Sequence, residues 1–446
     1  MAFKDRWLLS RNLVACSYFF RALLSSGEPP PLIEADQVLK HVRSLANNKA
    51  ADIFGVSSEH LKHASPIIIS ILTDIVNRVF ASGKLPEDVK IGLATPIPKK
   101  AKTQTDPDKF RRITITSLIG KVIEKHMVHL SKPALRIHQS PLQFGFTDGV
   151  SCNIAAMLLT ESILHCIDSK VPIYITYMDA SKAFDVVDHD SALVHLFKQG
   201  VHGKLWRCYN SLYTSITSHI KWKGHISPAL KEEQGIRQGG VSSTGIFKAK
   251  ANPCLSRLSD HPSSLRIGHI RVGALMVADD LVLMANTSND VQELVSEAQL
   301  DASRERFSFS KTKTRSMLIA KKTKGQPPPD PSVELYGTTI ETSSNETHLG
   351  ISRTDDGTNG DTVSNRIKTA RRTSYELMGA GLHGAYGVGP EITKHLWSIY
   401  VMPRFSYGLE ALLLSPKEVT RLEDFYRSNL FLSSGRHSHS DNFCGA

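Results

Sequence analysis

The sequence predicts an α+β fold in which an antiparallel sheet packs on helices. Two observations predict the sheet. The apolar runs 171–178 and 273–278 are β-prone, and each ends at aspartate: the first at Asp179, the second at the pair Asp279–Asp280. In the second run the two carboxylates separate two short apolar stretches, which indicates a hairpin turn. Apolar residues at helical spacing in several longer segments predict the helices.

Helical patterns recur along the whole chain. They cover residues 35–45, 66–80, 120–130, 151–167, 189–199, 290–304, 366–378, 390–400 and 416–431. Besides the two aspartate runs, strands are predicted at 90–97, 110–115, 316–319 and within 333–350. A glycine- and serine-rich turn at 235–245 is expected to open a further helix, and the basic, proline-rich segment 321–332 is the clearest linker.

Length and composition bound the class of protein. The 446 residues suggest about three domains. The net charge of +11 favours a polyanionic partner, nucleic acid above all. The six cysteines are scattered, so neither a zinc knuckle nor a disulfide framework is readable and reduced thiols are expected. Charged residues interrupt the apolar runs 12–24 and 67–80, and we therefore expect a soluble, intracellular protein without a membrane span.

The carboxylates that end the two strands carry the most specific chemistry. Several carboxylates gathered in one place repel one another unless a cation compensates them. Two Mg²⁺ ions that align a nucleoside triphosphate with a primer hydroxyl are the expected solution. For either element alone, the simpler reading is that these aspartates cap a strand and a turn.

Other blocks of sequence accompany the carboxylates in a specific order. Upstream lie 95–100 (TPIPKK), 110–113 (FRRI), 120–124 (GKVIE) and 143–146 (QFGF); then come 179–185 (DASKAFD), 237–239 (RQG), 277–280 (VADD), 313–314 (KT), 348–350 (HLG) and 403–410. Together they resemble the reverse transcriptase domain of non-LTR (LINE-type) retrotransposons, over about residues 35–430. One block alone is weak, but the ordered series is specific.

The resemblance implies a right-hand polymerase with fingers, palm and thumb. The expected parts are an N-terminal helical extension (1–84), fingers (85–170), a palm with interleaved finger elements (171–320), the linker (321–332), the post-palm region and thumb (333–434) and a flexible tail (435–446). The implied activity is RNA-directed DNA polymerisation. Asp179, Asp279 and Asp280 would hold two Mg²⁺ ions, and Lys313 would donate a proton to the departing pyrophosphate.

The resemblance also implies a nucleotide pocket. Lys99 and Arg111 would contact the triphosphate, Gln238 and Gly239 would line the pocket, and Phe184 would exclude a 2′-hydroxyl. Without the family pattern, Phe184 would be a core aromatic and each cation an ordinary surface residue. The basic stretch 366–372 fits phosphate contacts in the thumb, or equally a solvated helix face.

Three positions depart from the family pattern. Arg112 stands where the fingers motif usually has proline, Gly240 follows Gly239 where aspartate is common, and Val277 replaces an aromatic residue. Two alternatives therefore stay open: a catalytically inactive, decayed or co-opted palm that binds nucleic acid, and an RNA-dependent RNA polymerase, against which Phe184 argues.

The expected partners follow from the same resemblance. They are an RNA template, a DNA primer and deoxynucleoside triphosphates, with no membrane. The chain is expected to be either one piece of a longer element polyprotein with an endonuclease or a truncated copy. A ribonucleoprotein in the nucleus or cytoplasm is the expected setting.

Overall fold

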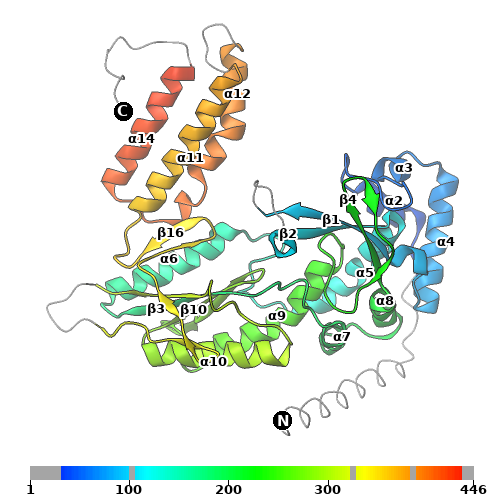
Figure 1. Cartoon of the computed structure of the whole chain (residues 1–446), viewed down its shortest axis with the longest axis horizontal. Coiled ribbons are helices and arrows are strands. Elements are labelled where there is room, and N and C mark those ends of the chain that lie inside the picture. Colours follow the sequence, from blue (N-terminus) through cyan, green and yellow to red (C-terminus); the bar gives the residue numbers. More distant parts are fainter. Residues whose placement is uncertain (1–31, 100–105, 322–327, 382–387, 434–446) are drawn as a thin grey trace. The chain divides into compact units, whose positions relative to one another are not determined.

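The computed structural model describes residues 32–99, 106–321, 328–381 and 388–433, and it confirms a mixture of helices and sheets (Figure 1). The strands pair mainly antiparallel, but each of the two larger sheets also contains one parallel pair of strands. The chain divides into two units. The first unit comprises Met1–Phe146, Ala180–Arg257 and Ala298–Phe309; the second comprises Thr147–Asp179, Leu258–Glu297 and Ser310–Ala446. Each unit is therefore assembled from segments that are far apart in the sequence. The predicted boundaries of fingers, palm and thumb stay predictions.

The first unit contains a sheet in the order β2-β1-β4-β5, with β6 beside β4. Its strands are β1 (Ile91–Pro98), β2 (Phe110–Thr116), β4 (Thr217–Trp222), β5 (His225–Ile226) and β6 (Leu230–Lys231). β1 pairs antiparallel with β2 and parallel with β4. Because parallel neighbours need a long crossover connection, β4 joins this sheet only after much intervening chain.

Helices cover the core of the first unit. They are α2 (Ala35–Arg43), α3 (Ser58–Lys62), α4 (Pro66–Ser82), α5 (Leu118–Ile137), α7 (His189–Lys198) and α8 (Gly203–Tyr213), with 3₁₀ turns η1 (Glu87–Lys90) and η2 (Pro107–Lys109). α4 shows why the chain is helical here: Pro66 begins it and Gly83, with a φ of 71°, ends it. Val76, Ile123 and Trp206 from three of these helices share one buried core.

Two helices extend across the division between the units. α9 (Ser243–Asp260) follows the predicted glycine- and serine-rich turn, and α10 (Ser288–Arg304) follows strand β10.

The second unit contains a sheet in the order β14-β11-β3-β10-β9. Its strands are β3 (Ile173–Asp179), β9 (Ala274–Val277), β10 (Asp280–Ala285), β11 (Arg315–Ile319) and β14 (Glu341–Thr342). β14 pairs parallel with β11. β3 is central, and every residue from Ile173 to Met178 is buried. Burial on both faces explains the uninterrupted apolar run that predicted this strand.

Hairpins and helices complete the second unit. The hairpins are β7 (Arg266–Ile267) with β8 (Ile270–Arg271), β12 (Glu334–Leu335) with β13 (Thr338–Thr339), and β15 (Asn345–His348) with β16 (Ile351–Thr354). The helices are α6 (Cys152–Asp168), α11 (Gly360–Gly379), α12 (Pro390–Tyr400), α13 (Met402–Ser406) and α14 (Pro416–Ser433), with η3 (Leu409–Ala411). Helices α11–α14 form a C-terminal helical bundle with its own core around Val401 and Phe425 (Figure 1).

Every predicted helix is present, with ends shifted by a few residues at most sites. Sequence reasoning missed helices α8 and α13 and strands β4–β8 and β16, most of which are short. The predicted tail and much of the predicted linker lie outside the described residues. Among the described helices, none has the length and apolar character needed to cross a membrane.

Candidate active site

The two aspartate runs meet in the second unit. Asp179 is the last residue of β3 and Asp280 is the first residue of β10. The antiparallel register of β3 and β10 sets Asp179 directly opposite Asp280. Opposite residues in such a pair have Cβ atoms about 4.5–5.5 Å apart. Carboxylates that are far apart in the sequence are thus brought together by sheet pairing.

A tight hairpin turn carries the third carboxylate. Val277 of β9 pairs with Asp280 of β10, so Ala278 and Asp279 form the turn between them. Ala278 has a φ of 59°, a left-handed conformation that an alanine adopts at a cost of about 1–2 kcal/mol. Backbone strain of this kind gathers where the surrounding structure holds a functional group in place. The hairpin predicted from the sequence is therefore present, with Asp279 at its turn.

The electrostatics of this edge favour a cation. Desolvation, followed by the like charges of Asp279 and Asp179, raises the pKa of Asp280 to about 6, while Lys313 opposes the shift. Asp280 is exposed at the start of β10. Lys313 Nζ lies 3.0 Å from Asp179 Oδ2. The ammonium group thus already compensates one of the carboxylates.

The loop before β11 delivers Lys313 to this edge. The Ser310 N–H donates to the Asp179 carbonyl oxygen at 2.8 Å, and the Thr314 N–H donates to the Ser310 carbonyl oxygen at 2.9 Å. The backbone of the residues around Lys313 therefore holds this predicted lysine beside the carboxylates.

The three carboxylates of this edge fit a metal ion that is held partly by the protein and partly by its substrate. In the described parts of the chain, no three His, Cys, Asp or Glu side chains form a ready-made metal site. Mg²⁺ is commonly held by one or two carboxylates together with substrate phosphates, rather than by an all-protein cage. Oxygen donors that face each other across two strands have the chemistry that such a site requires, and the pKa of one of them, Asp280, is raised by desolvation and by its like-charged neighbours.

The predicted pocket residues lie in the first unit. The Thr114 N–H donates to the Gln238 carbonyl oxygen at 2.8 Å, so residues 237–239 run beside β2. Gly239 has a φ of 127°, and a Cβ there would collide with the Thr114 carbonyl oxygen. Only glycine allows this approach. Gln238 is half-buried, and its position is fixed by strand β2.

Phe184 belongs to an aromatic group in the first unit. Its ring stacks on Phe247 with centroids 4.8 Å apart and meets Phe146 edge-on at 5.8 Å. It is partly buried against the core, while Phe146 is 45% exposed. Phe184 therefore packs against the core, as expected of a core aromatic residue. The aromatic group is still accessible to solvent at Phe146.

Lys99 and Arg111 are exposed cations of the first unit, at the end of the β1–β2 pair. Arg111 pairs with Ile97 across the two strands. Lys99 Nζ donates to the Asp108 carbonyl oxygen at 2.9 Å, and Lys182 Nζ lies 2.7 Å from Asp108 Oδ1. The structure thus gathers positive charge here, including one lysine that sequence reasoning did not single out.

A family model described as reverse transcriptase (RNA-dependent DNA polymerase) matches residues 97–352, more than half of the chain. This chain belongs to the reverse transcriptase family. Family membership confirms the fold class that the sequence predicted. The matched range of this reverse transcriptase domain includes all three carboxylates, Lys313 and the predicted pocket residues.

Curated relatives confirm the resemblance to non-LTR retrotransposons. A Pol polyprotein from the type-2 retrotransposable element R2DM of Drosophila melanogaster is 28% identical over 240 residues, covering 52% of this chain and 22% of the relative. A probable RNA-directed DNA polymerase from transposon BS of D. melanogaster is 24% identical, and the match covers 74% of this chain and 36% of the relative. The R1 Pol polyprotein of Bradysia coprophila is 26% identical, and the match covers 72% of this chain and 31% of the relative. The chain therefore spans roughly a fifth to a third of these relatives.

A solved structure of telomerase from Candida tropicalis is less similar in sequence than these relatives. It aligns over 83% of this chain and 62% of that chain, with 12% identity and a TM-score of 0.44.

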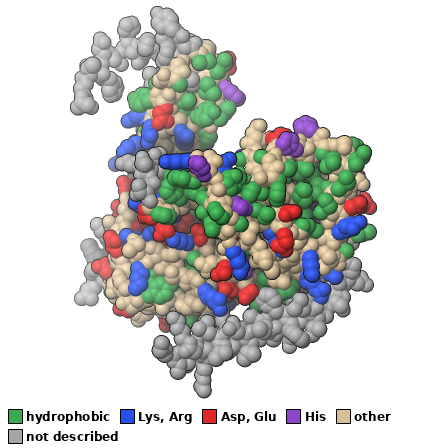
Figure 2. All heavy atoms as spheres, turned by 45° about the vertical axis from the view of Figure 1, so that its right-hand side comes forward, with side chains coloured by type: hydrophobic (Ala, Val, Ile, Leu, Met, Phe, Trp, Pro, Cys, Tyr) green, Lys and Arg blue, Asp and Glu red, His purple; other side chains and the backbone are tan. Residues whose placement is uncertain are grey.

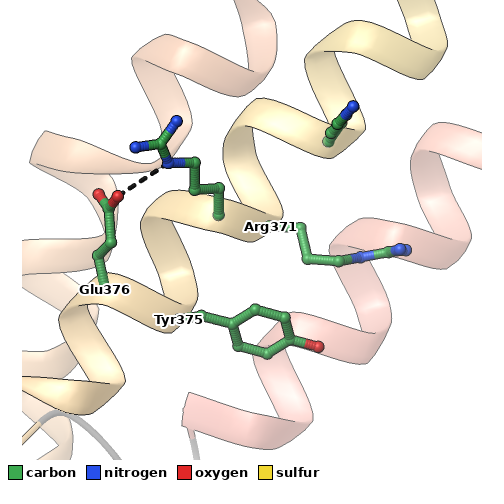
Figure 3. A pocket seen from close by; sticks show the side chains of 5 residues that line it. Arg371, Tyr375 and Glu376 are labelled. Atoms are coloured by element: carbon green, nitrogen blue, oxygen red, sulfur yellow. Dashed lines mark hydrogen bonds and ion pairs between the residues drawn. The ribbon is translucent and has the colours of Figure 1, made fainter. Parts of the chain in front are cut away.

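The basic stretch predicted for the thumb lies on α11 of the C-terminal helical bundle. A shallow pocket of about 490 Å³ is lined by Lys368, Arg371, Arg372, Tyr375 and Glu376. Figure 3 shows Arg371 and Tyr375 extending from one side of α11 toward α14, and Glu376 on the opposite side. A second pocket of about 650 Å³ between α11 and α14 shares Lys368 and Arg371.

Positive and negative side chains are mixed on the face of the molecule that Figure 2 shows. On the face shown in Figure 2, Lys and Arg side chains alternate with acidic and hydrophobic ones. The net charge of +11 is therefore not concentrated on that face, and the α11 cations are a more specific candidate for phosphate contacts.

Sequence reasoning missed a buried ionic network in the first unit. Glu232 is 7% exposed and lies between Arg112 and Arg237. Arg112 had been noted only as a departure from the family pattern. The signal available was a pair of acidic residues just before the Gly235–Gly239 segment, which by itself does not differ from a solvated turn.

Proposed function

We propose that this reverse transcriptase domain extends a DNA primer on an RNA template, within a non-LTR retrotransposon, by two-metal transfer of deoxynucleotides. The observation that carries the proposal is the register of β3 and β10, which sets Asp179 opposite Asp280 with Asp279 in the adjoining turn. The raised pKa of Asp280 and the ion pair from Lys313 to Asp179 support it, because both mark an edge that attracts cations.

The catalytic roles are divided among four side chains. Asp179 and Asp279 act as the principal ligands of two Mg²⁺ ions, with Asp280 beside them. When bound, the ions lower the pKa of the primer hydroxyl and stabilise charge on the transferring phosphate. Lys313 carries the proton that passes from its Nζ to the departing pyrophosphate oxygen. Its contact with Asp179 holds that proton at the reacting edge.

The pocket residues of the first unit select and hold the nucleotide. Arg111 clamps phosphate oxygens through its planar guanidinium group, and Lys99 adds a mobile point charge. Gln238 and Gly239 allow the nucleotide to approach the backbone beside Thr114. Phe184 lies under the sugar, where a flat ring leaves no room and no hydrogen-bond partner for a 2′-hydroxyl.

The template and primer are gripped through their phosphates. Lys368 and Arg371 on α11 supply contacts that do not depend on base sequence. The relatives named as Pol polyproteins support a further proposal, that the domain is part of a longer element protein. The endonuclease that the sequence resemblance implies would belong to the same protein. We place this activity in a ribonucleoprotein in the nucleus or cytoplasm.

Primer extension with purified protein tests this function. A DNA primer annealed to RNA is incubated with Mg²⁺ and either dNTPs or NTPs, using wild type and Asp279→Asn. We expect extension by wild type with dNTPs only, and none by Asp279→Asn, although the variant still binds the hybrid. Preference for NTPs would overturn the role of Phe184. Extension by both proteins would refute the assignment of Asp279, and no extension by wild type would favour the inactive palm.

A further inference from the structure

Arg112 departs from the family pattern at a position with structural consequences. It lies on β2 opposite Pro96 of β1, and its side chain is 38% exposed. Its guanidinium reaches two carboxylates: Nη2 lies 4.0 Å from Asp185 Oδ1, and Nη1 lies 3.7 Å from Glu232 Oε1. Proline, which the family resemblance leads one to expect here, could make neither contact, because it has no charged side chain.

Asp185 is the residue directly after Phe184. The backbone around it is held by residues 235–236: the Ile236 N–H donates to the Phe184 carbonyl oxygen, and the Gly235 N–H to the Val187 carbonyl oxygen, each at 2.8 Å. A Cβ on Gly235 would lie 2.8 Å from the Asp185 carbonyl oxygen, so the two segments are in close contact. Arg112 adds a side-chain link from β2 to the same segment.

Glu232 gives Arg112 a second role. The side chain of Glu232 is almost fully buried, and neither of its carboxylate oxygens accepts a hydrogen bond from the described residues. Its charge is balanced by Arg112 and by Arg237 Nε at 3.5 Å. A buried carboxylate without a nearby cation is costly, so the removal of either arginine disturbs the chain around it. Arg237 immediately precedes Gln238 and Gly239.

We propose that Arg112 is a positioning residue for sugar selection. It joins three segments that carry the pocket, namely β2, the Phe184–Asp185 segment and the 232–239 segment, and so fixes the ring of Phe184 relative to Gln238. The inference rests on the proposed role of Phe184. It assigns to Arg112 no contact with the nucleotide. Discrimination should therefore change when Arg112 loses its charge, even though the ring itself is unchanged.

Steady-state incorporation of a single nucleotide tests the inference. The ratio of kcat/KM for a dNTP to that for the matching NTP is measured for wild type, Arg112→Gln, Arg112→Lys, Asp185→Asn and Arg112→Gln/Asp185→Asn. We expect Arg112→Gln to lower the ratio about two- to fivefold, the upper part of the range of a partly exposed ion pair. Arg112→Lys keeps the charge and should retain most of the discrimination. Arg78→Gln, at an exposed arginine of α4, is the control for lost charge.

The double variant separates coupling from general damage. If Arg112 acts on Phe184 through Asp185, the ratio for the double variant should be close to that of either single variant. A merely structural role would lower both kcat/KM values equally and leave the ratio unchanged, which would overturn the inference. An unchanged ratio in Arg112→Gln, with discrimination still lost in Phe184→Ala, would refute the inference but keep the proposed function. A wild type that incorporates nothing would overturn both.

Discussion

The carboxylate edge of the second unit and the proposed nucleotide pocket of the first are built in different ways. Asp179 and Asp280 are held by the ladder of two paired strands, so many backbone hydrogen bonds maintain their register. The pocket is held by single hydrogen bonds, two close glycine contacts and a buried carboxylate between two arginines. The edge should therefore tolerate side-chain changes without loss of structure, whereas the pocket should respond to small changes in the backbone.

Asp179→Asn should have the largest effect on activity. The variant keeps the shape of the side chain and the pairing of β3, but it removes the charge of a proposed metal ligand. We expect the rate of single-nucleotide incorporation to fall by about 10³-fold or more, with hybrid affinity unchanged. Single-turnover extension and a binding titration measure the two quantities. Asp74→Asn, on the exposed side of α4, is the matched control, and an equal loss there would remove the special role of the edge.

Gly239→Ala should damage the pocket through its backbone. The new Cβ collides with the Thr114 carbonyl oxygen at a φ of 127°. We expect the free energy of unfolding to fall by about 2–4 kcal/mol, measured by denaturant titration. Gly224→Ala is the control, since Gly224 also has a positive φ, 86°, but nothing lies near its Cβ position. If both variants lost the same stability, the close approach to Thr114 would not matter.

Phe184→Ala should change selectivity more than rate. Without the ring, a ribonucleotide meets no obstacle at its 2′-hydroxyl, and we expect its use relative to the deoxynucleotide to rise about 10–100-fold. Competition between dNTP and NTP measures this ratio. Phe247→Ala removes the stacked partner of Phe184 but leaves the ring, so it should cost stability with a smaller change in selectivity. A larger change in Phe247→Ala would argue that core packing alone sets selectivity.

Lys368→Gln/Arg371→Gln should weaken binding of the hybrid without changing the chemical step. Each lost phosphate contact should reduce the slope of log K against log salt by about 1. A salt titration of hybrid affinity measures the slope. Arg372→Gln is the control on the same helix, because Arg372 Nε pairs with Glu376 Oε1 at 3.0 Å. Glu376 lies on the side of α11 opposite Arg371 and Tyr375 (Figure 3). An equal change in the control would indicate a general charge effect.

Asp280→Asn should have the smallest effect on stability, and the size of that effect depends on pH. The folded pKa of about 6 lies above the ordinary value of 3.8, so folding disfavours the ionised form. This penalty is absent below about pH 4 and complete above pH 6. In EDTA, the variant should therefore be more stable than wild type at pH 7, by less than about 1 kcal/mol because the side chain is exposed, and equally stable at pH 4. Thermal unfolding at the two pH values measures the difference in stability between the variant and wild type. A difference that shrinks as the pH rises would contradict the raised pKa of Asp280.

The contrast between the two regions also explains what the sequence could predict. The carboxylate edge was predictable because β3 and β10 are apolar runs whose ends are marked by aspartate, and sheet pairing then dictates which residues meet. The hairpin turn was predictable for the same reason. Helices with regular apolar spacing, such as α4 and α14, were also found.

The ionic part of the pocket was not predictable. Arg112, Asp185 and Glu232 are far apart in the sequence, and each occurs in a polar context that is equally typical of a solvated surface. Only tertiary packing buries Glu232 between two arginines. Strand β6, which ends beside it, has two residues and no periodicity to detect.

The central claim is that Asp179 and Asp279 act as one unit on the transferring phosphate. The most direct measurement is Mg²⁺-dependent incorporation of one dNTP into a DNA primer on RNA by Asp179→Asn, Asp279→Asn and the double variant. Residues that act as a unit have non-additive effects, so we predict that the double variant is no more than about tenfold slower than either single variant. Losses that multiply in the double variant, or a single variant with wild-type rate, would contradict the account.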